Sequence, residues 1–532
     1  MKKVIALLLA VLMLTAVFAG CAAKDAETQQ PAPTDEQTPD AQPTPSEETP
    51  DAPETEEPFE ISMLVVQQAG APLSEDMEVI QELQKRTNTK LTITSVAEDD
   101  MPQQIQSMIL ANQLPDLIEY RGTEANSLLE SGTLLYLNDY VNAENTPNLW
   151  KFMEENPDYS RDIHDDNGNI ACIAQATTRK WRCDWIINNT FLQELGMDMP
   201  NDIDSMYAYL KAVKEKYPDA TPLGVGPWAG GRNAVIQPVM YMFNVTNEFW
   251  QYEDGVYEYG PYERQDAYKQ ALEFLNKLYN EGLIDPEFWS ISAEDTNAKI
   301  SNNQVGLIYG WDDGYGQWGV DGTWGIDMVP CDPLAGPDGF AYIRPQPRKA
   351  QQFQYVTSSC KDPARLLQFV DYCFSDEGVE LLNWGIEGDH WEMKDGERVY
   401  TDKIMKNENG YVIGRYACGL AHPRLATVID GDAELLLNGK ETAKHVENMS
   451  LDYVKVFASI PSLTATPEEE EEYNLIFNDV NDAVKEAEAQ LITGAPEDFE
   501  AGFEALAQRL EDLNCERACE IRQAIYQRWL AR

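Results

Sequence analysis

The chain has 532 residues and a formal net charge of −51, from 40 basic and 91 acidic side chains. This balance excludes nucleic acid as a partner, because a phosphate backbone is bound by basic side chains. It also disfavours a strongly polyanionic ligand, because long-range repulsion slows the encounter.

The first twenty residues are typical of an export signal. Two lysines precede an apolar run from Val4 to Phe18, and two small residues stand directly before Cys21. A basic start, an apolar stretch and small residues at the cut define a secretory signal peptide, and a cysteine directly after the cut indicates a bacterial lipoprotein. Phe18 stands where lipoboxes usually carry Leu, Val or Ile, so an ordinary signal peptide with a chance cysteine stays the alternative. We expect residues 1–20 to be removed and Cys21 to be lipidated, which anchors the protein at the outer face of the cell membrane.

Residues 21–57 contain no apolar periodicity and are rich in Ala, Pro, Thr, Glu and Asp. Such a segment cannot bury enough surface to offset its ordering entropy. We therefore predict a disordered acidic tether that separates the folded region from the membrane.

The remaining residues, 58–532, are too many for one hydrophobic core and predict two domains. Strand-like runs alternate with helical periodicity, which predicts an α/β fold. The expected strands are Ile61–Val66, Leu91–Val96, Leu117–Tyr120, Val305–Tyr309 and Gln354–Ser358. The expected helices are Glu75–Arg86, Met101–Ala111, Arg264–Glu281, one that begins after Asp362, and the C-terminal Glu470–Leu491, Phe499–Leu513 and Cys515–Leu530.

Eight cysteines follow Cys21, and their spacing matches no zinc motif. Cys515 and Cys519 lie on one face of an expected helix, where helical geometry disfavours a disulfide. We expect most of these cysteines to be small buried apolar residues.

Several segments carry a family pattern when they are taken together. They are Met108–Ile118 with its Leu-Pro-Asp, Gly132–Tyr140, Trp185–Pro200, Leu275–Pro286, Ser375–Gly378 and Trp384–Trp391. In this order they resemble family 1 extracellular solute-binding proteins, the lipoprotein subunits of sugar ABC importers, and the last two are similar to the LipO-like branch.

The resemblance implies a two-lobed periplasmic-binding-protein-like fold of type II, with a ligand cleft between the lobes and a helical C-terminal region. We expect lobe one at residues 58–175 and 341–395, and lobe two at residues 176–340 and 396–532. The protein is expected to act as a monomer.

A sugar-binding site needs flat aromatic rings for the apolar faces of the sugar and planar polar groups for its hydroxyls. Ligands of open α/β sheets bind at the carboxyl ends of strands, so we searched strand ends and glycine-rich loops. The candidates are Tyr120, Trp181, Arg182, Trp228, Arg232, Trp311, Asp312, Glu387, His390 and Trp391. Each tryptophan has packing as its alternative role, and Glu387 has the alternative of bonding its own loop. We assign Trp150, Trp250, Trp289 and Trp529 to packing.

Some oligosaccharide-binding relatives in this family carry a calcium loop in lobe two, after its first helix, that is rich in Asp, Asn and Gly. Residues 214–222 occupy that place here and lack the required run of oxygen ligands. Asp165–Asn169 has a calcium-like composition, but Asn-Gly between strands is more often a hairpin turn. The sequence therefore predicts no metal and no other cofactor.

Catalytic motifs are also missing from the sequence: there is no G-x-S-x-G and no H-E-x-x-H. We expect a binding protein that captures a carbohydrate, in particular an oligosaccharide, and delivers it to an ABC permease. The alternatives are a sensory or adhesive lipoprotein with the same fold, and a glycoside hydrolase that uses a pair of carboxylates.

Overall fold

The computed structural model describes residues 57–532 except for short gaps at 121–123, 179–182, 227–232, 254, 312–323, 345–349, 409, 437–440, 459–460 and 462. The expected signal peptide, Cys21 and nearly all of the expected tether lie outside the described residues. Residues 57–532 form one compact unit. Within the described part of the chain, no helix combines the length and hydropathy that crossing a membrane requires.

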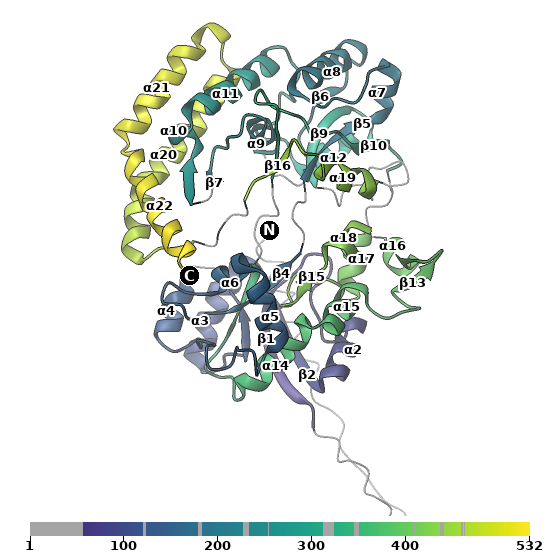
Figure 1. Ribbon diagram of the computed structural model, residues 1–532, viewed down its shortest axis with the longest axis vertical. Coiled ribbons are helices and arrows are strands. Elements are labelled where there is room, and N and C mark those ends of the chain that lie inside the picture. Colours follow the sequence, from purple (N-terminus) through teal and green to yellow (C-terminus); the bar gives the residue numbers. More distant parts are fainter. Residues whose placement is uncertain are drawn as a thin grey trace, which may run out of the picture. The chain divides into compact units, whose positions relative to one another are not determined.

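A six-stranded sheet organises the first lobe (Figure 1). Its strand order is β15 (Val428–Ile429), β4 (Ile173–Thr177), β12 (Ala350–Val356), β3 (Leu117–Glu119), β1 (Phe59–Val66) and β2 (Thr89–Val96). Only β12 is antiparallel to its neighbours. The helices of this lobe are α2 (Glu78–Thr87), α3 (Met101–Ala111), α4 (Glu124–Glu130), α5 (Pro147–Glu155), α6 (Pro157–Ile163), α14 (Pro363–Phe374), α15 (Asp376–Trp384), α16 (Asp402–Met405), α17 (Tyr411–Ala417) and α18 (Gly431–Leu436).

A four-stranded sheet organises the second lobe. Its order is β10 (Met328–Pro330), β5 (Cys183–Asn188), β9 (Val305–Trp311) and β6 (Thr221–Leu223), with β5 antiparallel to both of its neighbours. Smaller pairs are β7 (Phe249–Glu253) with β8 (Val256–Tyr259), and β11 (Ala341–Ile343) with β16 (Val454–Val456). The helices are α7 (Asn189–Leu195), α8 (Ile203–Lys216), α9 (Asn233–Tyr241), α10 (Gly260–Glu263), α11 (Gln265–Asn280), α12 (Ala293–Ser301), α19 (Glu441–Met449), α20 (Pro467–Thr493), α21 (Phe499–Asp512) and α22 (Cys515–Leu530).

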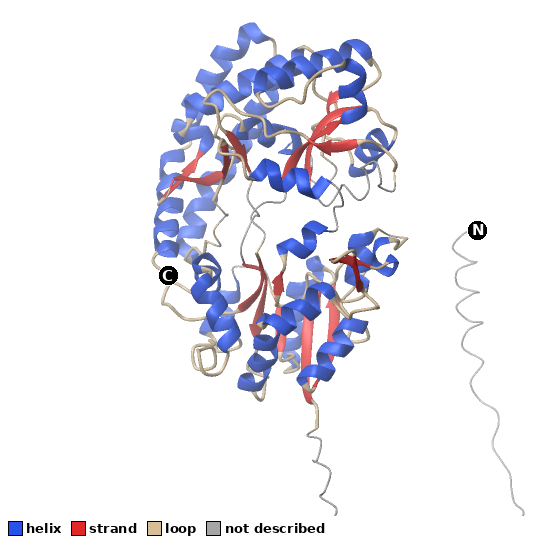
Figure 2. Cartoon of the chain, turned by 45° about the vertical axis from the view of Figure 1, so that its right-hand side comes forward, coloured by secondary structure: helices blue, strands red, loops and turns tan. Residues whose placement is uncertain are grey.

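Each sheet has its own hydrophobic core, with helices beside its strands (Figure 2). The largest buried cluster of the first lobe gathers β1, β4, α2, α5 and α14, and that of the second lobe gathers β5, β9, α8, α9, α11 and the C-terminal helices. The α/β class predicted from the alternation of strands and helices is therefore confirmed.

Helix α11 shows how directly the local pattern determined an element. Tyr279, in its predicted apolar stripe at helical spacing, is partly buried. The fully buried members of the stripe are Tyr268, Ala271, Leu272, Leu275 and Leu278. Gly282 has a φ of 62°, the left-handed conformation that ends many helices, and Leu283 N donates to Leu278 O at 2.8 Å.

Helix α14 begins as predicted. The Asp362 side chain accepts a hydrogen bond from Arg365 N at 3.0 Å, and Pro363 stands in the first turn, where its missing N–H costs nothing.

The C-terminal region is the predicted set of three helices. Helix α20 begins three residues earlier than predicted, because Thr466 and Glu469 form a capping box at its start. All eight cysteines of the described region are buried and outside disulfides, as expected for small apolar residues.

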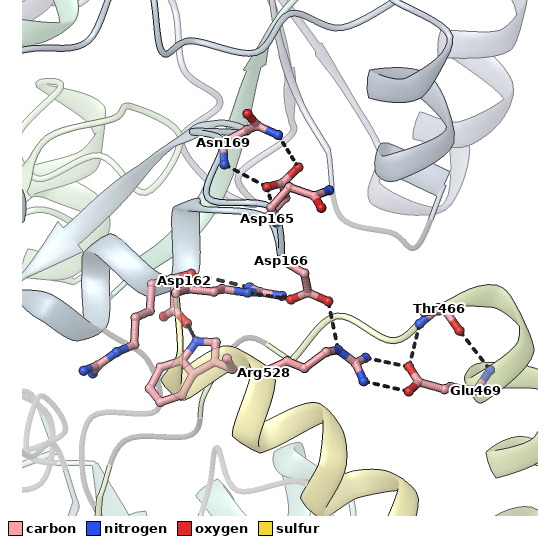
Figure 3. A network of polar contacts seen from close by, with 11 residues as sticks. Asp162, Asp165, Asp166, Asn169, Thr466, Glu469 and Arg528 are labelled. Carbon is pink, nitrogen blue, oxygen red and sulfur yellow. Dashed lines mark hydrogen bonds and ion pairs between the residues drawn. The ribbon is translucent and has the colours of Figure 1, made fainter.

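The last turn of α22 contacts the first lobe (Figure 3). The indole of Trp529 donates to Asp162 Oδ1 of α6 at 3.0 Å. Arg528 forms two hydrogen bonds with Glu469 of α20, at 2.7 and 2.6 Å, and a third with Asp166 Oδ2 at 3.1 Å. Arg532 donates to Asp166 Oδ1 at 2.7 Å. The end of the chain is thus bonded to α20 and to the segment that follows α6.

The expected lobe boundary at residue 395 differs from the structure. Residue 395 lies in the turn between β13 (Trp391–Lys394) and β14 (Glu397–Tyr400). Further on, β15 pairs with β4, so the first lobe continues at least to Ile429. Residues 341–343 pair with β16 and not with the first sheet. The sequence offered no signal that the first lobe continues to Ile429, because β15 has only two residues.

Candidate functional site

Each of the two sheets has an edge at which the chain passes to the other lobe. In the first lobe, the carboxyl ends of β3 and β4 share an edge with the start of the antiparallel β12. In the second lobe, Cys183 at the start of β5 pairs with Trp311 at the end of β9.

The crossing segments are short. Thr177 to Cys183 and Arg344 to Ala350 are each six residues along the chain, which an extended backbone spans in about 22 Å at most. These two segments therefore hold the two edges close together, and each edge carries a group of polar side chains.

The first edge is built around a buried ion pair. Glu119 is fully buried at the end of β3, where its Oε1 accepts from Arg424 Nη1 at 2.9 Å and its Oε2 accepts from Val66 N at 3.0 Å. Arg424 Nη1 also donates to Gln352 Oε1 at 2.8 Å. Arg424 Nε is buried without a hydrogen-bond partner among the described residues, so it can donate to a further acceptor.

Gln352 has an unusual backbone conformation. Its φ of 53° is in the left-handed region, and it lies where the register of β12 against β4 shifts between Gln351 and Gln354. A bulge of this kind re-aims a side chain, and strained residues of this kind concentrate at functional sites.

His422 holds the segment that carries Arg424. Its Nδ1 accepts from Arg424 N at 3.2 Å, so its Nε2–H is the donor to Ala71 O at 2.9 Å. Burial lowers the pKa of His422 to about 4, which keeps the ring neutral and both hydrogen bonds in place at neutral pH.

The second edge contains a small cavity with a volume of about 20 Å³. It lies between the end of β9, the start of β5 and helix α9. Its lining residues are Cys183, Asn233, Gln237, Pro238, Tyr241, Tyr309, Gly310, Trp311 and Arg344. Burial raises the pKa of Tyr309 well above its ordinary value, so this phenol is neutral.

A series of hydrogen bonds behind the cavity wall orients the side-chain amide of Gln237. Gln237 Nε2 donates to Asn247 Oδ1 at 3.1 Å, and Asn247 Nδ2 donates to Glu488 Oε1 at 2.9 Å. Tyr268 donates to the same oxygen of the fully buried Glu488 at 2.9 Å. The lining is thus held by a network that reaches into the core of the lobe.

The structure brings two of the predicted site residues to these edges. Tyr120 is buried directly after β3, beside Glu119, and Trp311 is partly buried in the cavity wall. Five predicted residues lie outside the described residues: Trp181, Arg182, Trp228, Arg232 and Asp312.

Glu387, His390 and Trp391 have other surroundings. Glu387 is exposed, and His390 is buried with its Nε2 3.0 Å from Glu78 Oε2 of α2. Trp391 packs against Trp384 with ring centroids 6.3 Å apart. The loop after α15 folds back on α2, so His390 and Trp391 have a packing role in the described structure.

Glu78, His390 and Cys418 come close enough for a metal site, with ligand atoms within 4.8 Å of one another. However, His390 Nδ1 accepts a hydrogen bond from Ile386 N at 3.1 Å. The proton of the neutral ring is therefore on Nε2, the nitrogen that faces the cluster, and this nitrogen has no free lone pair for a metal. Lys403 already pairs with Glu78.

The calcium-like segment is a turn between the bridge residues His164 and Ile170. The Asp165 carboxylate accepts hydrogen bonds from Asn167 N, Asn169 N and Asn169 Nδ2, at 2.8–2.9 Å. These internal bonds engage the oxygens that a cation would need.

Sequence reasoning missed the residues that define the polar part of both edges: Glu119, Gln237, Arg344, Gln352 and Arg424. Glu119 could have been found, since it precedes Tyr120 at a predicted strand end. Arg424 could not, because it meets Glu119 across 305 residues of chain.

Three curated relatives match about three fifths of the chain. Lipoprotein LipO of Bacillus subtilis is 25% identical over 62% of this chain and 66% of its own length. The fructooligosaccharide ABC transporter substrate-binding protein FusA of Streptococcus pneumoniae is 23% identical, over 60% and 62%. The polygalacturonan/rhamnogalacturonan-binding protein YtcQ of Bacillus subtilis is 22% identical, over 61% and 65%. The match thus spans slightly less than two thirds of each relative.

Solved structures share the fold over 89% of the chain. The alginate-binding protein AlgQ2 has a TM-score of 0.68 at 20% identity, with 99% of it covered. A human-milk-oligosaccharide (HMO) binding protein associated with an ABC transporter of Bifidobacterium longum infantis has a TM-score of 0.69 at 17% identity, also with 99% covered. At this identity the likeness shows the fold alone, and it confirms the predicted two-lobed α/β architecture.

Residues 70–380, more than half of the chain, match the family model described as bacterial extracellular solute-binding protein. The resemblance drawn from the Leu-Pro-Asp segment and the other motifs is thereby confirmed. The chain belongs to the bacterial extracellular solute-binding proteins, which bind ligands and are not enzymes.

Proposed function

We propose that this protein is a lipid-anchored carrier that captures an oligosaccharide between its two lobes and delivers it to an ABC permease. The observation that carries the proposal is the pair of edges at the lobe crossings. One edge presents an aromatic and amide cavity with Trp311, and the other presents Gln352 and Arg424.

This combination suits the chemistry of a sugar. The ring of the partly buried Trp311 offers a flat surface for the apolar face of a pyranose or furanose. Amide and guanidinium groups donate to and accept from hydroxyls in the ring plane. The names of FusA, YtcQ and AlgQ2 state carbohydrate ligands, which supports the same class for this chain.

The mechanism requires only binding and a change of lobe angle. A ligand that contacts both edges stabilises the closed arrangement by its differential affinity for that state. The permease then recognises the closed, loaded protein, and no covalent step is involved.

A thermal-shift screen tests the binding function. Wild-type protein is heated with a panel of neutral and acidic oligosaccharides, and with amino acids, peptides and nucleosides as the comparison set. A bound ligand at 100 times its Kd adds about 2.7 kcal/mol to the free energy of unfolding. Stabilisation by a non-carbohydrate and by no glycan would contradict the proposal.

Membrane attachment is tested at Cys21. The Cys21→Ala protein should keep its fold and its glycan binding but leave the membrane fraction of the expressing cells. If it stays in that fraction, the lipoprotein interpretation is wrong. Glycan uptake that continues in cells without this protein would instead favour a sensory role.

A further inference from the structure

Arg344 occupies a distinctive position at the second edge. It follows β11 directly, stands at the start of one crossing segment, and lines the cavity with Tyr241, Tyr309 and Trp311. Its backbone N donates to Tyr309 Oη at 3.4 Å. The residue is partly buried, and its Nε atom is inaccessible to solvent.

The guanidinium of Arg344 forms no ion pair with a described carboxylate. Its Nε lacks a hydrogen-bond partner, and no described carboxylate lies within ion-pair distance of its guanidinium. Tyr241 and Tyr309 stay neutral beside it, because burial raises the pKa of both phenols far above neutrality. Glu248 acts on the guanidinium only through space.

The other buried arginines of the described region differ from Arg344. Arg424 pairs with Glu119 at 2.9 Å, and Arg415 pairs with Glu434 at 3.1 Å. Arg344 is only partly buried, but a charge that lies partly out of water without a carboxylate partner still costs the fold free energy. A cation left unpaired at a cavity therefore points to an anion that is supplied from outside.

The cavity size limits what that anion can be. A volume of about 20 Å³ exceeds the roughly 10–15 Å³ that one water molecule requires, so it has room for one carboxylate oxygen but not for a sugar ring. The ring that bears the carboxylate would stay outside the cavity, against Trp311.

We propose that Arg344 binds the carboxylate of a uronic acid, and that the ligand is an acidic oligosaccharide. This inference rests on the proposed function and narrows its substrate class. The planar guanidinium suits a carboxylate because two N–H groups can bond its two oxygens. The acidic surface repels a dense polyanion, but this repulsion is screened within about 8 Å at physiological salt. We therefore expect a ligand with one or a few carboxylates.

Matched ligand pairs test the inference by calorimetry on the wild-type protein. The acids are short oligomers of galacturonate and mannuronate, and xylo-oligosaccharides with a glucuronate branch. Each is compared with its methyl ester, which keeps the sugar skeleton and removes the charge. We expect at least one acid to bind roughly 10- to 100-fold more tightly than its ester, with an affinity that falls as salt is added.

The outcomes separate this inference from the function on which it rests. If esters or neutral oligosaccharides bind as tightly as every acid, the Arg344 inference is wrong and the sugar-binding function stands. If no acid, ester or neutral oligosaccharide binds, the proposed function fails as well.

Substitutions then test whether Arg344 causes the preference for the acid over its methyl ester. Arg344→Gln should bind acid and ester with similar affinity, and Arg344→Lys should keep part of the preference through its charge alone. Arg509→Gln, on the exposed end of α21, is the control and should leave the preference unchanged.

Unfolding of the ligand-free protein provides a second readout. Arg344→Gln should have a free energy of unfolding close to that of wild type, because the guanidinium of this partly buried residue forms no ion pair with a described carboxylate and its Nε has no hydrogen-bond partner. A clear loss of stability would show that Arg344 has a structural role and would overturn the inference.

Discussion

Trp311 ends β9 and forms part of the cavity wall, and it is only partly buried. If a sugar stacks on this indole, Trp311→Ala should weaken glycan binding by about 1–3 kcal/mol, or roughly 5- to 150-fold, judging from the burial of a large side chain. Calorimetry measures the affinity, and circular dichroism checks that the free protein keeps its fold.

Trp150 is the matched control for this substitution. It is partly buried on α5, where its Nε1 donates to Glu154 at 3.0 Å. Trp150→Ala should bind the glycan as wild type does. Equal affinity of Trp311→Ala and wild type would mean that the ligand lies at another strand end, and unfolding would mean that Trp311 is a core residue.

The ion pair of Glu119 with Arg424 is buried, so its two halves depend on each other. Glu119→Ala leaves the guanidinium unpaired and should lower the free energy of unfolding by about 3–5 kcal/mol. The double substitution Glu119→Leu with Arg424→Met should cost less, because no unpaired charge remains. Denaturant titrations of both proteins measure the difference, and a double substitution that costs more than Glu119→Ala would show that the two charges do not depend on each other.

His422 gives the protein a pH dependence whose sign follows from its lowered pKa. The unfolded ring binds a proton near pH 6.5, whereas burial lowers the folded pKa to about 4. The unfolded state therefore binds more protons between these values, and stability falls as the pH drops from 6.5 to 4, by roughly 3 kcal/mol in total.

Urea titrations between pH 4 and pH 7 measure this loss for wild type and for His422→Gln. The wild-type curve should fall more steeply than that of the variant, because glutamine does not titrate. Parallel curves would exclude His422 as the source.

Helix α22 joins elements that lie far apart in the sequence. Arg528 bonds Glu469 at the start of α20 and Asp166 after α6 (Figure 3). Arg528→Met should lower stability by about 1–3 kcal/mol, because each of its hydrogen bonds involves two charged groups. It should also raise hydrogen exchange in residues 157–163, where α22 is bonded.

Arg517 on the same helix is the control. Its ion pair with Glu472 is exposed, and an exposed pair contributes about 0–1 kcal/mol. Arg517→Met should therefore leave both stability and exchange near the wild-type values. Equal effects of the two substitutions would contradict a special role for the end of α22.

Two lobes joined by short crossing segments can change their angle when a ligand bridges them. We expect the radius of gyration in solution scattering to decrease when the glycan found in the screen is added at saturation. An unchanged radius at saturation would contradict the closure mechanism. The Trp311→Ala protein provides the comparison, since it should need more ligand to reach the same radius.

The sequence was sufficient for the elements whose signals are local. The apolar stripe of α11, the Asp362 cap of α14 and the first three strands follow from periodicity and capping, which depend on neighbours a few residues away. The family motifs work in the same way, because each is a short segment read in chain order. These signals were enough for the α/β class, the C-terminal helices and the family.

Long-range pairing decided the rest. Strand β15 has only two residues and forms because it pairs with the edge of β4. A segment this short shows no hydrophobic periodicity from which a strand could be predicted. Trp250 is buried, as its assignment to packing predicted, but it lies in β7, a strand that no expected element covered and that pairs with β8. The first lobe therefore extends beyond the expected boundary.

The candidate site depends on the tertiary structure most of all. Arg424 meets Glu119 across 305 residues, and the lack of a carboxylate partner for Arg344 is a property of its surroundings. Composition predicted aromatic rings and polar groups at strand ends, as Trp311 shows. The pairing of the charges is decided only when distant segments come together. Ion pairing and desolvation depend on distance in space and not along the chain.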